Sequence, residues 1–361
     1  MLNSTVKTIG ILTSGGDAPG LNAAIRGVCY TCIEKYGIKV VGFRDGYRGL
    51  ISGDSFAVTK ENISDILAEG GTFLGTSRCK PFKKPVEDPE TGLLPVDAIK
   101  KNYKKFKLDA LVVLGGNGTN STASLLAQEG LNVIGLPKTI DNDIVGTDVT
   151  FGFHTAVDVA TEAIDRIRST ARSHGRVMVV EVMGHKAGWL GLYSAIASGA
   201  DACLIPEIPY EIGVVAKAVN EVRNSGKGFS IIVVAEGALS VDEAKMDKKA
   251  FKRARAAMPQ SIGYRVAKEL EEATGAEVRV SVLGYLQRGG TPSPYDRVLA
   301  TQFGTTAAEM LVKGEFGNLV AMQNNEIVGI PLETCAGKVK NIPAEHPLIQ
   351  TGRSVGICFG D

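Results

Sequence analysis

Three features that mark other classes of protein are missing from this 361-residue sequence. No apolar run approaches the roughly eighteen residues that a membrane-spanning helix needs, which excludes a membrane protein. Neither sign of charge is in excess, since there are 40 Lys and Arg residues and 39 Asp and Glu residues. This balance argues against a protein that wraps nucleic acid or binds an acidic membrane surface. The first residues, MLNSTVKTIGIL, lack the pattern of a secretion signal, so we expect a cytoplasmic protein.

The six cysteines also lack the spacing of a zinc site. Cys29 and Cys32 form a C-x-x-C pair, but no second Cys or His pair follows at the spacing that zinc ligands require. The pair falls within an apolar helical stripe, so we expect both residues to be small core side chains. Reduced thiols agree with the cytoplasm.

Glycine, in contrast, is abundant: 43 of 361 residues, about 12%, against a usual share of roughly 7%. The sequence has no collagen period and no low-complexity tract, so these glycines are expected at particular turns. The length favours two domains, because single cores usually stop growing at about 250 to 300 residues. One stretch without periodicity, roughly 79–96, is expected to be an exposed loop.

Short runs rich in Val, Ile and Leu alternate with helical stretches along the chain. Near-continuous apolar runs of this kind are typical of strands buried on both faces, as in a parallel sheet covered by helices. The fold class is therefore predicted to be α/β. The predicted strands are 8–13, 40–44, 110–116, 133–137, 177–182, 230–237 and 278–284.

Two predicted strand-to-helix turns are rich in glycine. The first lies in ILTSGGDAPGLNAAIRG and contains Gly15, and the second lies in LVVLGGNGTNSTASLLA and contains Gly116 and Gly118. Glycine lets the backbone approach a ligand, and the N–H groups of the following helix favour phosphate. The first turn has neither the Walker nor the G-x-G-x-x-G spacing, so a tight turn without a ligand remains an alternative there. Since both follow parallel strands, one nucleotide is expected to span both turns.

The segment LPKTIDNDIVGTD places two carboxylates close together after a buried strand. Asp141 and Asp143 are two residues apart, and such a pair can divide roles, one accepting a proton and the other orienting a group or holding a metal. Asp residues are also common in ordinary turns. Together with two phosphate turns upstream, the pair favours phosphoryl transfer to an alcohol.

The second half of the chain contributes cations at strand ends. Arg176 begins the strand RVMVVEVMG, Glu236 ends the strand IIVVAEG, and Arg279 and Arg288 lie in EVRVSVLGYLQRGG. The planar fork of arginine suits a phosphate monoester. Each arginine taken singly better fits a solvated surface charge or an ion pair, but their placement on successive strand ends favours a phosphate site.

These segments together resemble the 6-phosphofructokinase family, from residue 7 to about 325. The residues that carry the resemblance are ILTSGGDAPGLNAAIRG, GGTFLGTSR, GGNGT, PKTIDND, VVEVMG, AEG and GYLQRGGTPSPYDR. It implies Mg²⁺-dependent phosphorylation of fructose 6-phosphate at its 1-hydroxyl by a homo-oligomer, usually a tetramer. It also implies two Rossmann-like three-layer domains with mainly parallel sheets: 1–152 with about 287–337 for the phosphoryl donor, and 153–286 with about 338–361 for the sugar phosphate.

The resemblance also implies a role for each matching residue. Asp141 is the implied proton acceptor, and Thr139 and Gly15 are placed at the transferred phosphoryl group. Arg176 and Arg279 are implied to reach the sugar phosphate of a neighbouring subunit. The rest of the implied sugar pocket is Ile140, Met183, Gly184, His185, Glu236, Tyr285, Leu286, Gln287 and Arg288. The implied donor site is Gly15, Tyr47, Arg78, Cys79, Gly116, Asn117, Gly118 and Thr119.

The identity of the phosphoryl donor depends on three positions whose signals disagree. In this family an Asp at the position of Gly118 marks users of pyrophosphate, because its charge and bulk oppose the α-phosphate of ATP. Gly118 therefore favours ATP. Lys138 and Tyr285, however, resemble the pyrophosphate branch. We give Gly118 more weight because it bears directly on whether the α-phosphate fits, so ATP is the expected donor and pyrophosphate the alternative.

Two departures from the family pattern sustain a different class of function. Most relatives have Asp or Glu at Asn117, where a carboxylate helps to hold Mg²⁺, so Asp143 and the donor phosphates become candidate metal ligands. The family also has Arg at the position of His185, which is neutral or only partly charged near pH 7. A catalytically weak regulatory subunit that binds sugar phosphate is therefore a second alternative. A third alternative is an NAD or lipid kinase, which shares a GGDGT-like turn with this family. The other motifs of this sequence are not expected in such a kinase.

Overall fold

The structure, a computed structural model, describes residues 5–83, 85–258 and 260–361. Lys84, in the loop predicted over 79–96, lies outside the described residues. The chain divides into two compact units. Unit 1 comprises Met1–Ile140, Ile144–Thr155 and Arg288–Val339, and unit 2 comprises Asp141–Asp143, Ala156–Gln287 and Lys340–Asp361.

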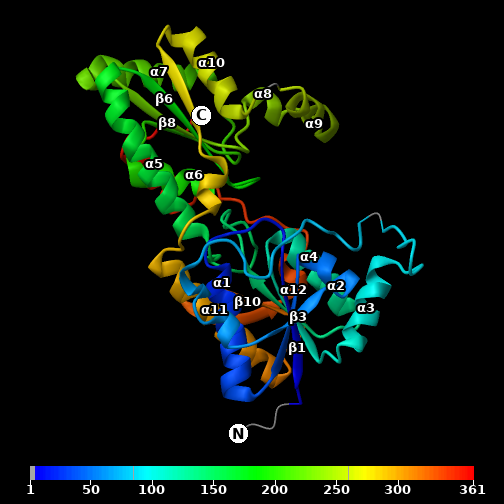
Figure 1. Cartoon of the computed structure of the whole chain (residues 1–361). Helices are drawn as coiled ribbons and strands as arrows, with labels where there is room; N and C mark the ends of the chain where they lie inside the picture. Colours follow the sequence, from blue (N-terminus) through cyan, green and yellow to red (C-terminus); the bar gives the residue numbers. More distant parts are fainter. Residues whose placement is uncertain (1–4, 84, 259) are drawn as a thin grey trace. The chain divides into compact units, whose positions relative to one another are not determined.

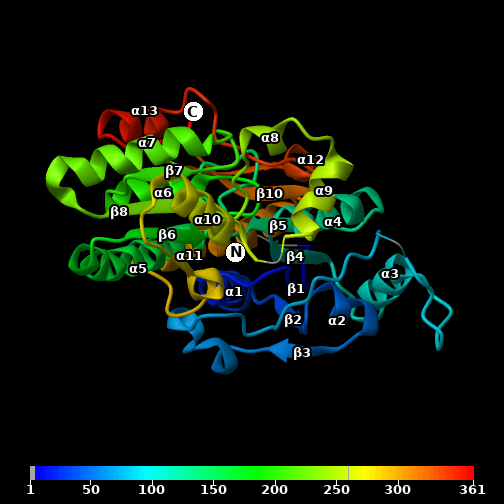
Figure 2. The same cartoon turned by 90° about the horizontal axis from the view of Figure 1, so that it is seen from above.

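A seven-stranded sheet forms the centre of unit 1. Its strand order is β11-β10-β5-β4-β1-β2-β3, and Figure 2 shows β5, β4, β1, β2 and β3 following one another across it. The inner pairs are parallel, whereas β3 and β11 at the two edges are antiparallel to their neighbours. The strands are Thr8–Ser14 (β1), Lys39–Phe43 (β2), Ser55–Val58 (β3), Ala110–Gly115 (β4), Val133–Pro137 (β5), Asn318–Gln323 (β10) and Glu326–Pro331 (β11).

Helices cover both faces of this sheet, as Figure 1 shows. Successive side chains of β4 point to opposite faces: Val112 and Leu114 pack in one buried cluster with α1 and α11, and Leu111 and Val113 pack in another with α2, α3 and α4. The helices of unit 1 are Leu21–Tyr30 (α1), Thr31–Lys35 (η1), Tyr47–Ser52 (α2), Glu61–Ile63 (η2), Ile66–Ala68 (η3), Pro95–Lys105 (α3), Asn117–Gln128 (α4), Pro294–Lys313 (α11) and Leu332–Cys335 (α12).

A four-stranded parallel sheet of order β7-β8-β6-β9 forms the centre of unit 2. Its strands are Val177–Val182 (β6), Ala202–Leu204 (β7), Ser230–Ala235 (β8) and Val278–Val282 (β9). Val179 and Ile232 pack with α7 and α10 in a buried cluster. The helices are Phe153–His174 (α5, which begins in unit 1), Trp189–Ser198 (α6), Ile212–Val222 (α7), Arg223–Lys227 (η4), Val241–Ala244 (α8), Lys248–Ala256 (α9), Ile262–Thr274 (α10), Gly284–Arg288 (η5) and Pro347–Ser354 (α13).

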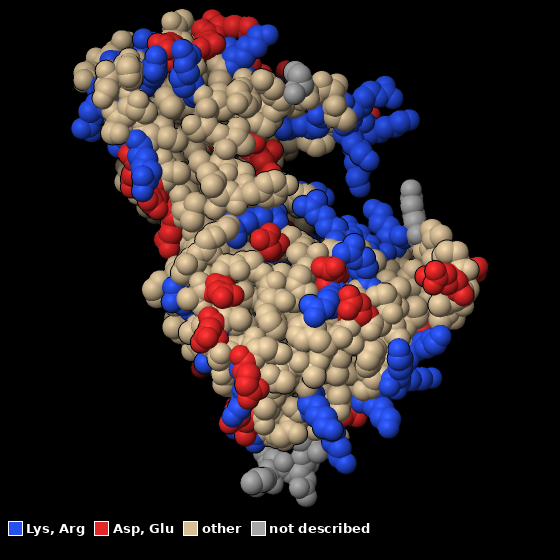
Figure 3. Space-filling view, in the orientation of Figure 1, with Lys and Arg blue, Asp and Glu red and all other residues tan. Residues whose placement is uncertain are grey.

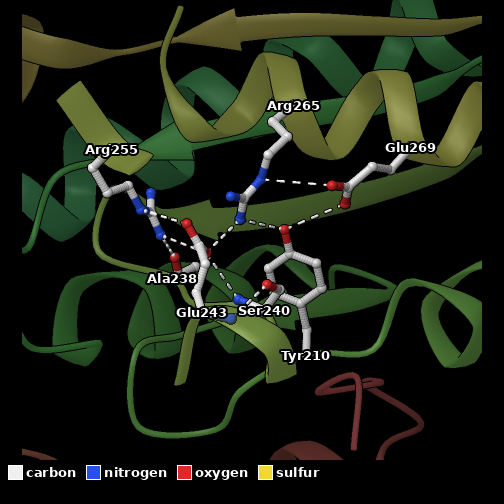
Figure 4. A network of polar contacts seen from close by, with 7 residues as sticks. All are labelled: Tyr210, Ala238, Ser240, Glu243, Arg255, Arg265 and Glu269. Atoms are coloured by element: carbon white, nitrogen blue, oxygen red, sulfur yellow. Dashed lines mark hydrogen bonds and ion pairs between the residues drawn. The ribbon is translucent and has the colours of Figure 1, made fainter. Parts of the chain in front are cut away.

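A buried carboxylate joins α8, α9 and α10 (Figure 4). Glu243 accepts from Nη2 of Arg265 at 2.7 Å and pairs with Nε of Arg255 at 2.9 Å. Tyr210 connects this group to Glu269, since its hydroxyl accepts from Arg265 at 2.8 Å and donates to Glu269 at 3.4 Å. Burial acts to raise the pKa of Glu243, but the hydrogen bond from Arg265 and its other partners outweigh burial and lower the pKa.

The exposed side of α9 is basic. Lys248, Lys249, Lys252 and Arg253 are all exposed, and Figure 3 shows Lys and Arg atoms gathered where α9 lies in Figure 1. The inner side of α9 packs only partly, through Phe251 and Ala254, and no described residue of the helix is fully buried. Arg255, which pairs with Glu243 and donates to the carbonyl of Ala238, is therefore a main attachment of α9 to the rest of unit 2.

The predicted fold class, α/β with mainly parallel sheets, is confirmed. Each predicted strand is present. Cys29 and Cys32 are core residues, each 0% exposed. Burial raises the pKa of the Cys32 thiol to about 12. Strands β3, β7, β10 and β11 were not predicted; the last two form a hairpin whose turn residues Asn324 and Asn325 both have positive φ, a signal typical of such turns. No helix in the described part of the chain has the length and hydropathy to span a membrane.

Candidate active site

The first glycine-rich turn follows β1 and is held by the segment at residues 72–77. The N–H of Gly15 donates to the carbonyl of Ser77 at 2.9 Å, and the hydroxyl of Thr76 donates to the carbonyl of Gly15 at 2.7 Å. Gly15 has a φ of +89°, a left-handed conformation that favours glycine. Thr76 and Ser77 belong to the GGTFLGTSR segment, but the sequence predicted no role for them because their contact is between segments about sixty residues apart.

The second turn follows β4 and is tied to the first by Thr119. The hydroxyl of Thr119 donates to the carbonyl of Ser14 at 3.0 Å, and the carbonyl of Thr119 accepts from the Tyr47 hydroxyl at 2.9 Å. Tyr47 is fully buried, so it supports the turn from the core side and does not face solvent. The structure therefore brings together the two turns that were predicted to share one ligand.

The beginning of α4 offers open space at Gly118. A Cβ built on Gly118 would meet one heavy atom within 4 Å among the described residues, Cε of Lys80 at 3.9 Å. Gly16 differs, because a Cβ there would overlap the guanidinium of Arg288. Arg288, predicted to contact the sugar phosphate, thus lies against the first turn in unit 1, while Gly118 leaves room for a ligand at the second.

Lys138 brings a positive charge to the first turn. Its ammonium donates to the carbonyl of Gly16 and lies 3.8 Å from the place of a Cβ on Gly15. The side chain is 3% exposed. A buried ammonium is costly unless it is well hydrogen-bonded or meets an anion, so the position of Lys138 suits the phosphates of a donor at this turn.

The segment after Lys138 passes from unit 1 to unit 2. Thr139 and Ile140 are buried in unit 1, and the carbonyl of Thr139 accepts from Thr150 at 2.7 Å. The next residues, 141–143, group with unit 2, where Lys340 holds them: its N–H donates to the carbonyl of Asp143 at 2.8 Å. Asp143 is 5% exposed and Asp141 is half-buried.

Two side chains fix the backbone at the carboxyl ends of the unit 2 strands. Gln287 accepts from the N–H of Met183 at 2.9 Å, and Glu236 accepts from the N–H of His185 at 2.8 Å. His185 has a φ of +53°, and its side chain is exposed, as are those of Tyr285 and Leu286 on η5. The residues predicted to line a sugar pocket therefore lie together at the carboxyl ends of these strands: Met183, Gly184, His185 and Glu236.

Arg176 and Arg279 lie at the other ends of these strands, the amino ends. Arg176 precedes β6 and Arg279 is the second residue of β9, so both are at the amino ends of their strands. At about 3.3 Å per residue, Arg176 is roughly 20 Å from Met183. Arg176 and Arg279 both pair with Glu277; Nε of Arg176 donates to it at 2.8 Å. The hydrogen bond from Arg176 lowers the pKa of Glu277.

Asp296 is an important buried residue for which the sequence predicted no role. It is 0% exposed at the start of α11 and accepts from the N–H of Gly152 at 2.9 Å and from the N–H and hydroxyl of Thr155 at 2.7 and 2.6 Å. Burial raises the pKa of Asp296 although these three donors act to lower it. Asp296 fixes the segment that leads into α5, and only its place in the PYDR motif distinguished it.

The described residues contain no group of three or more His, Cys, Asp or Glu side chains that could hold a metal ion. Asn117 begins α4 in unit 1, and Asp143 belongs to unit 2. Both offer oxygen ligands, which Mg²⁺ prefers, and Mg²⁺ commonly takes one or two protein ligands together with substrate phosphates and water. Each of these residues, taken within its own unit, could therefore supply one oxygen to a metal held mainly by donor phosphates.

The fold and these turns define a class of protein: an α/β protein with two glycine-rich turns suited to phosphates at the ends of parallel strands. Residues 8–311 match the family described as Phosphofructokinase. The chain belongs to the phosphofructokinase family, as the motifs predicted.

Relatives and solved structures agree with this family. The chain is 60% identical to an "ATP-dependent 6-phosphofructokinase" of Spirochaeta thermophila, over 100% of both chains. It is 50% identical to "ATP-dependent 6-phosphofructokinase 3" of Bacteroides thetaiotaomicron, over 98% of this chain and 99% of that one. The solved phosphofructokinase of Saccharomyces cerevisiae is 33% identical with a TM-score of 0.79, covering 91% of this chain and 45% of that one.

Proposed function

We propose that this protein transfers the γ-phosphoryl group of ATP to the 1-hydroxyl of fructose 6-phosphate, giving fructose 1,6-bisphosphate, a reaction of glycolysis. The observation that carries the proposal is the open space at Gly118 in the second glycine-rich turn. Names of full-length relatives at 45–60% identity, all ATP-dependent 6-phosphofructokinases, support it. We assign the phosphoryl donor to unit 1 and the sugar phosphate to unit 2.

The positions of Gly118 and Lys138 reconcile the conflicting donor signals. Lys138 lies at the first turn, beside Gly15 and Gly16, where it suits the reacting phosphates that ATP and pyrophosphate have in common. Gly118 lies at the second turn, where only the longer donor has a further phosphate. Lysine at 138 is therefore compatible with either donor, and glycine at 118 favours ATP over pyrophosphate.

The chemistry proposed for Asp141 is general base catalysis. As the 1-hydroxyl oxygen forms its bond to the γ-phosphorus, Asp141 accepts the hydroxyl proton, and the bond from that phosphorus to the bridging oxygen breaks to release ADP. Lys138 and the backbone at Gly15 hold the donor phosphates, and Thr139 contacts the transferred group. Mg²⁺, held by Asn117, Asp143 and the donor phosphates, would neutralise phosphate charge.

The sugar phosphate is proposed to contact residues from two subunits of a homo-oligomer, most simply a tetramer. Glu236 and the Met183–His185 segment, with Tyr285, Leu286 and Gln287 of unit 2, bind the sugar; Ile140 and Arg288, which lie in unit 1, stay predictions made from the sequence. The roughly 20 Å that separate Arg176 from Met183 prevent one chain from using both edges of the sheet for one small ligand. Arg176 and Arg279 are thus assigned to the phosphate bound by a neighbouring subunit.

Arg78 and Cys79, at the end of the GGTFLGTSR segment and just beyond it, are proposed to contact the nucleotide. Arg78 is exposed and Cys79 is packed against the unit 1 core. We place the enzyme in the cytoplasm, which suits its six free cysteines, because reducing conditions keep thiols unpaired there.

One coupled assay tests the proposed function. Purified protein is given fructose 6-phosphate and Mg²⁺ with either ATP or pyrophosphate, and formation of fructose 1,6-bisphosphate is followed through an aldolase-linked readout. Turnover with ATP that exceeds turnover with pyrophosphate by at least a hundredfold is expected. The reverse preference contradicts the choice of donor. Binding of fructose 6-phosphate without turnover from either donor, with activity gained in the Asn117→Asp, His185→Arg double variant, supports the regulatory subunit instead.

A further inference from the structure

A lysine outside the predicted donor site lies over the open space at Gly118. Cε of Lys80 is 3.9 Å from the place that a Cβ on Gly118 would occupy. Lys80 is exposed, so its ammonium group is accessible to a ligand. The position was assigned no role from the sequence, where Lys80 falls in the stretch expected to be a solvent-exposed loop.

The backbone around Lys80 is held in place by its neighbours. Cys79 and Phe82, on either side, pack against the buried cluster that includes Tyr47 and Leu111, and Pro81 is buried. The N–H of Lys83 donates to the carbonyl of Lys80 at 3.0 Å and closes a turn. The apolar neighbours thus pack into the core, while Lys80 extends over the beginning of α4. These contacts hold the backbone that carries Lys80 in one position.

Lys138 and Lys80 bring positive charge to two different turns of the proposed donor site. Lys138 lies at the first turn, beside Gly15, whereas Lys80 lies at the second, beside Gly118. A donor whose reacting phosphates occupy the first turn meets Lys80 only if it continues with another phosphate. On the proposed function, a nucleoside triphosphate has such a further phosphate, and pyrophosphate does not.

We propose that Lys80 binds the α-phosphate of the nucleotide and so contributes to the selection of a nucleoside triphosphate over pyrophosphate. The inference rests on the proposed function, since it takes ATP as the donor. Glycine at 118 supplies the room for the α-phosphate, and Lys80 supplies the opposite charge. The two residues form one specificity element: an acidic residue at 118 would both fill the space and pair with Lys80.

The first test measures steady-state kinetics of Lys80→Met, with Lys101→Met as control, because Lys101 is an exposed lysine on α3 in the same unit. We expect the KM for ATP to rise about tenfold in Lys80→Met, the cost of 1.4 kcal/mol. The KM for fructose 6-phosphate and the melting temperature should change little. Lys80→Arg, which keeps the charge, should stay within about threefold of the unaltered protein.

The second test does not depend on turnover. Binding of AMP and of adenosine is measured by calorimetry, because the two differ only in the α-phosphate. Lys80→Met should weaken AMP about tenfold and leave adenosine unchanged. Three results would overturn the role of Lys80. The first is an equal loss of affinity for AMP and adenosine, and the second is a KM for ATP within twofold of normal. The third is a parallel rise in the KM for fructose 6-phosphate. Absence of ATP-dependent turnover in the unaltered protein instead contradicts the proposed function, and the AMP comparison still tests the contact.

Discussion

Unit 1 and unit 2 present their candidate binding groups in different ways. In unit 1 the groups are mainly backbone: two glycine-rich turns, tied to each other by Thr119 and fixed by Thr76 and Ser77. In unit 2 they are mainly side chains, such as Glu236 and Arg279, carried at the ends of parallel strands. A polyphosphate repeats one anionic group, which backbone N–H groups can hold, whereas a sugar requires individually placed polar groups. Substitutions that change charge or size in each unit test this contrast.

The largest expected effect is the loss of the proton acceptor. Asp141→Ser should lower kcat by about 10² to 10⁴, the usual contribution of a general base, and change the dissociation constant of fructose 6-phosphate by much less. Steady-state kinetics and calorimetry measure the two quantities, with the exposed Asp65→Ser as control. A variant with normal kcat would show that another group accepts the proton.

The next largest effect is expected from filling the space in the second turn. Gly118→Asp brings a carboxylate to the place proposed for the α-phosphate, and two like charges 4 Å apart repel by about 4 kcal/mol at an effective dielectric constant of 20. The kcat/KM for ATP should fall between tenfold and about a thousandfold, with little change in the KM for fructose 6-phosphate. Gly118→Ala, which adds bulk without charge, is the matched control. Unaltered ATP kinetics in Gly118→Asp would refute the donor assignment.

A smaller effect, confined to unit 2, is expected at the amino ends of its strands. Arg279→Ala should raise the KM for fructose 6-phosphate by about ten- to a hundredfold, because a hydrogen bond to a charged group contributes roughly 1.5–3 kcal/mol.

Mixing subunits distinguishes a contact within one chain from a contact across chains. Arg279→Ala and Asp141→Ser proteins, unfolded and refolded together, should regain activity, since a site made from both chains has an intact Asp141 and an intact Arg279. Each variant refolded alone is the control. Mixtures no more active than the separate variants would place Arg279 and Asp141 in sites of the same chain.

The smallest effect concerns stability and not ligand binding. The folded state lowers the pKa of Glu243 from its ordinary value of 4.5, so its stabilising contribution is complete above that value and is lost as the pH falls through the lowered pKa. Glu243→Gln should reduce the melting temperature at pH 7 by a few degrees and flatten its decrease in acid. Melting curves between pH 3 and 7 measure both; a variant whose acid decrease matches the unaltered protein would show that other carboxylates control it.

The main elements of the fold were predictable because their signals are local. Runs such as VMVVEV in β6 are apolar throughout, as strands buried on both faces must be. The hairpin of β10 and β11 carries a weaker signal, since β10 has a run of only three buried residues and β11, at the sheet edge, has none. Cys29 and Cys32 were correctly predicted as core residues from helical spacing.

The candidate site was predictable only where a motif carries it. The residue types at Gly15, Gly118 and Asp141 follow from segments that resemble a family. The role of Lys80 did not follow, because its proximity to Gly118 joins residues 38 positions apart through the packing of Cys79 and Phe82. Asp296 is similar, since its partners Gly152 and Thr155 precede it by more than 140 residues.

The sequence by itself determined the class of fold, the family and the glycine-rich turns, because apolar periodicity and glycine at a turn act within a few neighbouring residues. Only the tertiary structure decided which charges meet which turn: Lys138 at the first, Lys80 at the second, and Arg176 and Arg279 together at the far edge of the unit 2 sheet. Charge acts through space, and the distances between these groups are set by sheet order and packing, which no local pattern specifies.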